Sequence, residues 1–152
     1  MDTPETASAS GYGLLDGVPP PLILPGLYDF RFDYYETKVL FGRAPKLILW
    51  FTVVTFGDYF DRVRLPRYYN LARLMEKPRK WGRFKVGYKS DFLREYATLF
   101  ATPPRLDRIP MSVFENVTVT GKVRTVSTGA KQEAIPAALQ YSVIGQLVEA
   151  KK

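Results

Sequence analysis

The sequence contains no cysteine and no histidine in its 152 residues. Without cysteine, the chain cannot form disulfides, use a thiolate nucleophile, or bind zinc and iron–sulfur clusters through sulfur ligands. Without histidine, it lacks the usual general base near neutral pH, histidine triads and most catalytic zinc sites. Because these two absences remove most familiar enzyme chemistry, we expect a protein that is not an enzyme and that holds no metal or cofactor.

Long hydrophobic runs are absent as well. The longest apolar segment, residues 47–56, has ten residues and includes two threonines, whereas a transmembrane helix needs about 20 apolar residues. Residues 1–5 have neither the basic start nor the apolar core of a signal peptide. The sequence therefore predicts a cytoplasmic protein that has no membrane partner.

What the sequence does have is the composition of a folded domain. Hydrophobic residues make up 46% of the chain and charged residues 24%. A chain of this length buries roughly 70% of the surface that its unfolded state exposes. Residues 1–21 are rich in small residues, glycine and proline, so we expect a flexible N-terminal arm, followed by one domain over residues 22–150.

Hydrophobic periodicity predicts five strands in this domain. Tyr28, Phe30, Phe32 and Tyr34 alternate with charged residues, which is typical of a strand with one buried face. The five strands are expected over residues 27–36, 46–55, 59–65, 113–126 and 139–149.

One helix is expected between the third and fourth strands. Ser90 can cap its N-terminus, and the apolar residues at positions 92, 96, 99 and 100 have the spacing of a buried helical stripe. Two prolines after Thr102 end the helix. Pro66 is expected to end the third strand, and Gly121 to form a bulge or a bend in the fourth.

Three strands, one short helix and two strands follow one another in the OB-fold, a five-stranded and partly open barrel. We therefore predict a mostly β protein with an OB-fold-like barrel and a long basic loop, residues 66–89, between the third strand and the helix. Other five-stranded α+β folds, and an SH3-like barrel with an inserted helix, would give the same order of elements.

Over about residues 24–150, the chain resembles the OB-fold single-stranded DNA-binding proteins of phages and mobile elements. The resemblance rests on Pro-Gly-Leu-Tyr at residues 25–28, Leu-Pro-Arg-Tyr-Tyr-Asn at 65–70, the helix, and Tyr-Ser-Val-Ile at 141–144. It implies a protein that binds single-stranded DNA with little sequence preference and serves DNA replication, recombination or the transfer of a mobile element.

The resemblance also implies a replication or recombination protein as a partner. Bacterial proteins of this class typically recruit such partners through an acidic C-terminal tail. This sequence departs from that pattern, because it ends in Glu149, Ala150, Lys151 and Lys152. Recruitment through such a tail is therefore not expected.

Positive charge is concentrated in one part of the chain. The net charge is +7 in total, whereas residues 62–94, here called the basic stretch, hold eleven basic and two acidic side chains, a net charge of +9. Residues 1–61 hold four basic and eight acidic side chains, a net charge of −4. This asymmetry favours a polyanion as the partner, either nucleic acid or an anionic membrane surface, although Pro78, Gly82 and Gly87 interrupt the long amphipathic helix that a membrane-surface role would need.

Nonspecific binding of a single strand needs cations that follow the phosphates and flat side chains that stack on the bases. The basic stretch interleaves both kinds, and we predict that it binds nucleic acid. Its candidate cations are Arg62, Arg64, Arg67, Arg73, Lys77, Arg79, Lys80, Arg83, Lys85 and Lys89, and its candidate stacking residues are Tyr68, Tyr69, Trp81, Phe84 and Tyr88. The alternative is a solvated loop whose aromatic residues simply pack beneath it.

The second strand is apolar on both faces, because Ile48, Trp50 and Val54 form a row opposite the residues that should face the core. This row must be covered by the arm, the basic loop, a second subunit, or bases stacked on Trp50. Packing within the chain or in a homodimer is the favoured explanation. Lys122 and Arg124 share one face of the fourth strand and could extend the positive track.

Two loops complete the candidate site. Residues 37–45 carry Lys38 and Arg43, and residues 127–138 carry Lys131. In OB-folds, the corresponding loops grip the nucleic acid, although with so few charges these could be ordinary surface loops. The sequence has no pattern that reports a 2′-hydroxyl contact, so RNA stays open as the nucleic acid.

Two other functions compete with nucleic-acid binding. Glu36 and Lys38 have the Glu-x-Lys spacing of metal-dependent nucleases, but no aspartate on a preceding strand accompanies them. The stronger alternative is a small interaction or inhibitor protein that docks on an acidic partner through the basic loop and the apolar row of the second strand.

Overall fold

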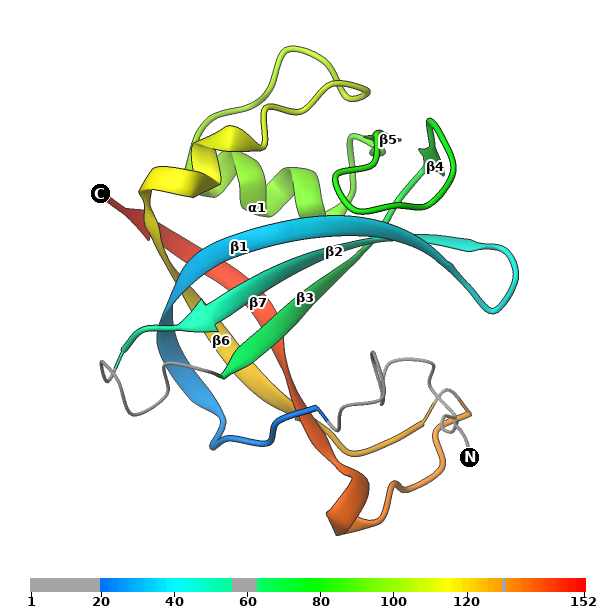
Figure 1. The fold of residues 1–152 in the computed structure, drawn as a ribbon, viewed down its shortest axis with the longest axis vertical. Helices are drawn as coiled ribbons and strands as arrows, with labels where there is room; N and C mark the ends of the chain where they lie inside the picture. Colours follow the sequence, from blue (N-terminus) through cyan, green and yellow to red (C-terminus); the bar gives the residue numbers. More distant parts are fainter. Residues whose placement is uncertain (1–19, 56–62, 130) are drawn as a thin grey trace.

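The computed structural model describes residues 20–55, 63–129 and 131–152. The chain is mostly β, and its long strands form one antiparallel sheet in the order β3-β2-β1-β6-β7 (Figure 1). These strands are β1 (Gly26–Leu40), β2 (Ala44–Val53), β3 (Arg64–Asn70), β6 (Thr118–Val126) and β7 (Tyr141–Lys151). The other elements are the short strands β4 (Arg73–Leu74) and β5 (Phe84–Lys85), the helix α1 (Asp91–Leu99), and the 3-10 helices η3 (Ser112–Asn116) and η4 (Ala137–Leu139).

A register shift in β1 changes which of its aromatic residues face the core. Tyr28, Phe30 and Phe32 are buried as predicted, but the pairing with β2 shifts between Phe32 and Tyr34. After the shift, Tyr35 joins the buried core, and Tyr34 lies opposite Trp50 on the outer face. The prediction that Tyr34 shares the face of Phe32 is therefore wrong, because a bulge reverses the alternation of side chains.

The third strand does not end at Pro66. Pro66 lies inside β3, opposite Trp50 of β2, and the strand continues to Asn70. Proline is tolerated there because β3 is an edge strand of the sheet. The loop predicted over 66–89 therefore begins at residue 71 and contains the β4–β5 pair, while the expected start of the third strand at 59–62 lies outside the described residues.

The fourth strand is shorter than predicted. It begins at Thr118 instead of residue 113, because residues 112–116 form η3 and bury Phe114 in the core. The bulge expected at Gly121 is confirmed by a register shift between Thr120 and Gly121 in the pairing of β6 with β7.

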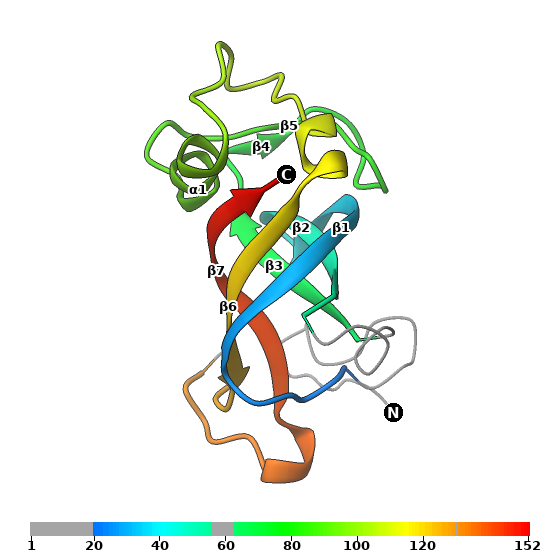
Figure 2. The ribbon, with the colours of Figure 1, turned by 90° about the vertical axis from the view of Figure 1, so that its left-hand side faces the viewer.

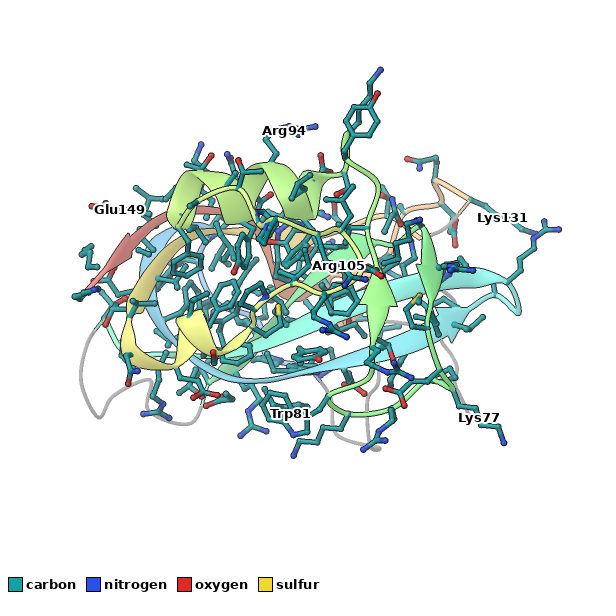
Figure 3. The ribbon with its side chains drawn as sticks, turned by 90° about the horizontal axis from the view of Figure 1, so that it is seen from above. Lys77, Trp81, Arg94, Arg105, Lys131 and Glu149 are labelled. Atoms are coloured by element: carbon teal, nitrogen blue, oxygen red, sulfur yellow. The ribbon has the colours of Figure 1, made fainter. Side chains whose placement is uncertain are left out.

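The helix follows its sequence signals. The hydroxyl of Ser90 accepts a hydrogen bond from the Leu93 backbone N–H, as the cap prediction required, and α1 buries Phe92, Leu93 and Tyr96. Figure 2 shows α1 and the β4–β5 pair at one end of the sheet, opposite the β6–β7 loop. Arg94 projects from α1 away from the core (Figure 3).

The two edge strands, β3 and β7, approach each other next to α1. In the described part of the chain, no backbone hydrogen bond joins them. Glu95 of α1 bridges them instead, because its Oε1 atom accepts hydrogen bonds from the Tyr69 hydroxyl at 2.7 Å and from the Leu147 backbone N–H at 2.9 Å. A helix side chain thus links the two edges of the sheet.

The segment before β1 is tied to the start of β7. The Ser142 backbone N–H donates to the Pro21 carbonyl, and Ile23 exchanges two hydrogen bonds with the Ser142 hydroxyl. Residues 1–19 of the expected arm lie outside the described residues. Across residues 20–55, 63–129 and 131–152, no helix has the length and apolar character that crossing a membrane requires.

Candidate nucleic-acid interface

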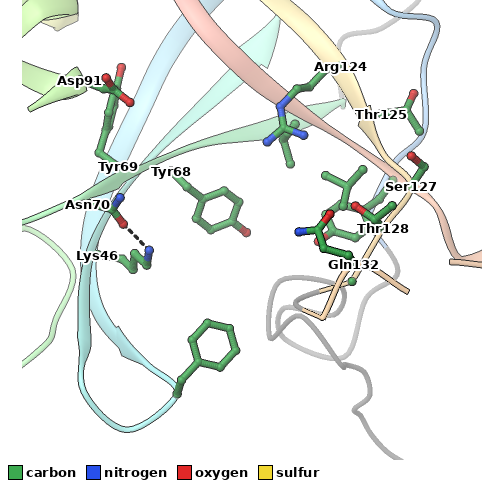
Figure 4. Close-up of a pocket in the computed structure, with 15 residues that line it drawn as sticks. Lys46, Tyr68, Tyr69, Asn70, Asp91, Arg124, Thr125, Ser127, Thr128 and Gln132 are labelled. Atoms are coloured by element: carbon green, nitrogen blue, oxygen red, sulfur yellow. Dashed lines mark hydrogen bonds between the residues drawn. The ribbon is translucent and has the colours of Figure 1, made fainter. Parts of the chain in front are cut away.

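A pocket of about 550 Å³ lies between the β1–β2 turn, the outer face of β3 and the β6–β7 loop (Figure 4). The alternation of side chains along β3 builds its floor, because Tyr68 and Asn70 point outward while Tyr69 points into the core. Its lining also includes Phe41, Lys46, Asp91, Arg124, Thr125, Ser127, Thr128 and Gln132.

Two cations face this pocket from opposite sides. The Lys46 ammonium donates to the Asn70 side-chain carbonyl (Figure 4), and partial burial lowers the pKa of Lys46 from its ordinary value of 10.5. An anion beside Lys46 would favour its charged form. Arg124 forms no ion pair with any described residue, and it lies across β7 at Gly145, where a Cβ would come within 3.1 Å of the Arg124 Cδ atom.

The rest of the lining can bind a polar ligand. Thr125, Ser127 and Thr128 supply hydroxyl groups, and Asn70 and Gln132 supply amides. Among the described lining residues, Asp91 is the one carboxylate, and Arg94 pairs with it at 2.7 Å. The pocket therefore combines two cations with many neutral donors, which suits a phosphate-bearing ligand.

The sequence-based prediction located this site only in part. It included Tyr68, Tyr69 and Arg124, and it considered the 127–138 loop but slightly favoured an ordinary surface loop there. It missed Phe41, Lys46 and Asn70, although Phe41 is an exposed aromatic residue in a turn, with a φ of 55°. The loop charges that it named, on Lys38, Arg43 and Lys131, do not line the pocket.

Many cations of the basic stretch remain available for a ligand. Glu76 lies within 3.7 Å of both Arg79 and Arg83, and Asp33 lies 3.2 Å from Arg64, yet these three arginines stay exposed. Arg62 lies outside the described residues. Five further cations are exposed and have no ion pair within the described chain, namely Arg73, Lys77, Lys80, Lys85 and Lys89.

Three predicted binding residues are structural instead. Tyr69 and Phe84 are 3% and 5% exposed and belong to the core, so their rings are not available to stack on a base. Arg67 is ion-paired with Glu95, and its side chain is 12% exposed. Their assignment to the binding surface is corrected, because the partners that bury them come from elsewhere in the chain.

The outer row of β2 is covered, as its apolar character predicted. Ile48 is 1% exposed and Trp50 is 9% exposed. The Trp50 ring stacks on Tyr34, and its Nε1–H donates to Glu36 at 2.7 Å. Trp50 is therefore not exposed to a base, and Glu36, which also pairs with Lys38, acts as a hydrogen-bond acceptor.

Three other candidates lie on the surface. Tyr88 is 74% exposed and Trp81 is 44% exposed. Lys122 is exposed on β6 but does not line the pocket that Arg124 lines. No cluster of three carboxylates that could hold a metal ion occurs in residues 20–55, 63–129 and 131–152.

Comparisons of the chain with protein-family models, with curated proteins and with solved structures find no match.

Proposed function

We propose that this protein is a non-enzymatic OB-fold protein that binds single-stranded DNA with little sequence preference, in replication, recombination or the transfer of a mobile element. The order of the five long strands supports the fold assignment, with α1 between the third and fourth of them. The approach of β3 to β7, bridged by Glu95, supports a partly open barrel.

The pocket of about 550 Å³ is the observation that carries this proposal. It lies between the β1–β2 turn and the β6–β7 loop, above the outer faces of β2 and β3. Oligonucleotide ligands of OB-folds bind at the second and third strands, between the corresponding two loops. In this proposal, Lys46 and Arg124 contact phosphates, and Tyr68 and Phe41 contact bases; all four residues line the pocket.

Binding in this proposal has two physical sources. Cations of the pocket and of the basic stretch replace the counterions of the strand, which makes affinity fall with salt. Aromatic side chains stack on unpaired bases, and every base has a face on which this is possible, so sequence preference stays small. RNA would satisfy the same contacts.

The test is fluorescence anisotropy with a labelled thirty-nucleotide dT, matched duplex DNA and matched RNA, at two or more salt concentrations. We expect wild type to prefer single strands and to lose affinity as salt rises. The double variant K46A/R124A removes two phosphate contacts, so its log–log salt slope should be shallower by about 1.4, which is about 0.7 per contact.

The control is R105A/R108A, which removes the same charge in the loop between α1 and η3, away from the pocket. This control variant should have the same log–log salt slope and the same affinity as wild type. Failure of wild type to bind any of the three nucleic acids at low salt would refute the proposal. Equal effects of the two double variants would show that net charge matters and the pocket does not.

The alternative function, docking on an acidic protein through the row of Ile48, Trp50 and Val54, loses its anchor. Ile48 and Trp50 are buried, and Val54 is half-buried. Anchor residues of protein interfaces need to be exposed before the partner arrives. The same measurement separates the two functions, because a docking protein would shift no oligonucleotide.

A further inference from the structure

Residues 79–81 of the basic stretch form hydrogen bonds with one edge of β1. The strand pairs with β6 only as far as Arg31, so this edge is open to another segment beyond that residue. The Trp81 N–H donates to the Tyr35 carbonyl at 3.0 Å, and the Thr37 N–H donates to the Arg79 carbonyl at 3.0 Å. These bonds fix the backbone on both sides of Lys80.

Side chains hold the same turn in place. Thr37 is 1% exposed, and its hydroxyl accepts from the Arg79 backbone N–H at 3.1 Å. A Cβ at Gly82 would lie 2.6 Å from the Thr37 Oγ1 atom, so the turn can close only with glycine there. The Glu76 carboxylate accepts from the Arg83 backbone N–H at 2.7 Å and lies between the Arg79 and Arg83 guanidinium groups.

The outcome of this packing is a tryptophan that is both fixed and exposed. Trp81 has a φ of 62°, which a bulky residue adopts only where its surroundings impose it. Its ring centroid lies 5.3 Å from that of Tyr35 and 6.3 Å from that of Phe32, yet 44% of the residue remains exposed. A large apolar side chain held this firmly at the surface suits a ligand with a flat face.

A lysine lies over the tyrosine ring that neighbours Trp81. The Lys80 ammonium lies 4.3 Å from the Tyr34 ring centroid, and the Tyr34 ring lies 6.4 Å from that of Trp81. Figure 3 shows Trp81 and Lys77 on the same side of the sheet, opposite Arg94. Neither Lys77 nor Lys80 forms an ion pair within the described chain.

We propose that residues 76–83, here called the Trp81 clip, bind one unpaired nucleobase, which stacks on Trp81 while Lys80 contacts the adjoining phosphate. This inference rests on the proposed function and adds a division of roles to it. In a duplex, both faces of each base are covered by its neighbours, so only a single strand can offer a base to the ring. The clip therefore adds to the preference for single strands, and the pocket supplies the charges of Lys46 and Arg124 together with the rings of Tyr68 and Phe41.

One strand can reach both places. Trp50, whose ring stacks on Tyr34 beside the clip, is four residues from Lys46 in β2, a distance of about 13 Å along a strand. OB-folds bind about 4–16 nucleotides, so the pocket and the clip fit within one binding site.

The experiment compares the binding of dT thirty-mer and matched duplex to W81A, W81F and the control variant L27A. We expect W81A to weaken dT binding by about 5- to 150-fold, with less than a twofold change for the duplex. Phenylalanine can still stack, so W81F should recover most of the affinity. The control is L27A, because Leu27 is a large apolar side chain that is 60% exposed and belongs to neither the clip nor the pocket, so this variant should bind dT as wild type does.

A second measurement uses the unmodified protein and does not depend on how a variant folds. Because Trp50 is 9% exposed and Trp81 is 44% exposed, acrylamide should quench mainly Trp81. We expect dT thirty-mer to protect this fluorescence from acrylamide and duplex at equal occupancy to protect it much less.

The outcomes separate this inference from the function on which it rests. If wild type binds dT but acrylamide still reaches Trp81, or if W81A weakens dT and duplex equally, the clip is not the site of base stacking. If wild type binds no nucleic acid, the proposed function itself fails.

Discussion

The two faces of β3 carry similar kinds of residue, but one face packs against α1 and the other lines the pocket. Arg67 and Tyr69 point inward, where Glu95 of α1 binds both of them. Tyr68 and Asn70 point outward and line the pocket. One residue along the strand separates an arginine and a tyrosine that bind Glu95 from a tyrosine that lines the pocket.

The difference lies in the partner that each face meets. On the inner face, the Arg67 guanidinium lies 4.2 Å from the Tyr69 ring centroid and is ion-paired with Glu95, so its charge is already neutralised. On the outer side, and among the described residues, Lys46 contacts only a neutral amide and Arg124 forms no ion pair with a carboxylate. Around β3, the buried cation is neutralised by its carboxylate partner, and the cations that face the pocket remain available to a polyanion.

The largest effect should come from removing the partner of the inner face. E95A would leave Arg67 buried without its counter-ion and would break the bridge from β3 to β7. We expect a loss of about 3–5 kcal/mol in the free energy of unfolding, measured by urea denaturation. The exposed Glu115 offers a control, because E115A should change stability by less than about 0.5 kcal/mol. A similar small loss for E95A would mean that the bridge is not structural.

The next effect separates the two tyrosines. Y69F removes a buried hydroxyl that donates to Glu95, so it should cost about 1.5–3 kcal/mol of stability and leave dT binding within twofold of wild type. Y68A should weaken dT binding by about 5- to 150-fold through the lost stacking surface. Both variants need a melting curve and an anisotropy titration. Weaker binding by Y69F at full stability would overturn the contrast between the two faces.

The smallest effect concerns alkaline pH. Burial, with Glu95 adding to it and Arg67 opposing it, raises the pKa of Tyr69 well above its ordinary value of 10.0. Above pH 10, the unfolded state therefore loses this proton while the folded state keeps it, so stability falls as pH rises, by at most about 1.4 kcal/mol per pH unit for one group. In Y69F, the free energy of unfolding should fall less steeply as the pH rises above 10. An identical pH dependence in the two proteins would show that Tyr69 ionises freely in the fold.

Signals that act over a few residues predicted much of the fold. Ser90 caps α1, Gly121 lies at a bulge, and the apolar periodicity located four of the five long strands, whereas the predicted third strand overlaps β3 only at residues 64 and 65. The predicted ends of strands were wrong where the position in the sheet or packing in the core determines them. Pro66 stays in β3 because that strand has a free edge, and residues 112–116 form a 3-10 helix because Phe114 is buried.

The candidate site was less accessible to prediction. Composition located the positive charge in residues 62–94, and the interleaved aromatic residues indicated a nucleic acid as the partner. Alternation in β1 could not reveal that a bulge turns Tyr34 outward, next to Lys80. Nor could it show that Lys46 and Arg124, 78 residues apart by their numbers, face one pocket.

The sequence by itself determined the order of the elements, the concentration of charge and the chemistry that the chain lacks, because each depends on residue types or on short-range spacing. The tertiary structure alone decided which cations are neutralised, which aromatic rings are buried, and that Trp81 is held at the surface. Those outcomes depend on contacts between remote segments, such as Arg67 with Glu95 and Thr37 with Arg79. Whether a charged or aromatic side chain supports the fold or meets a ligand is set by the neighbours that the fold brings to it.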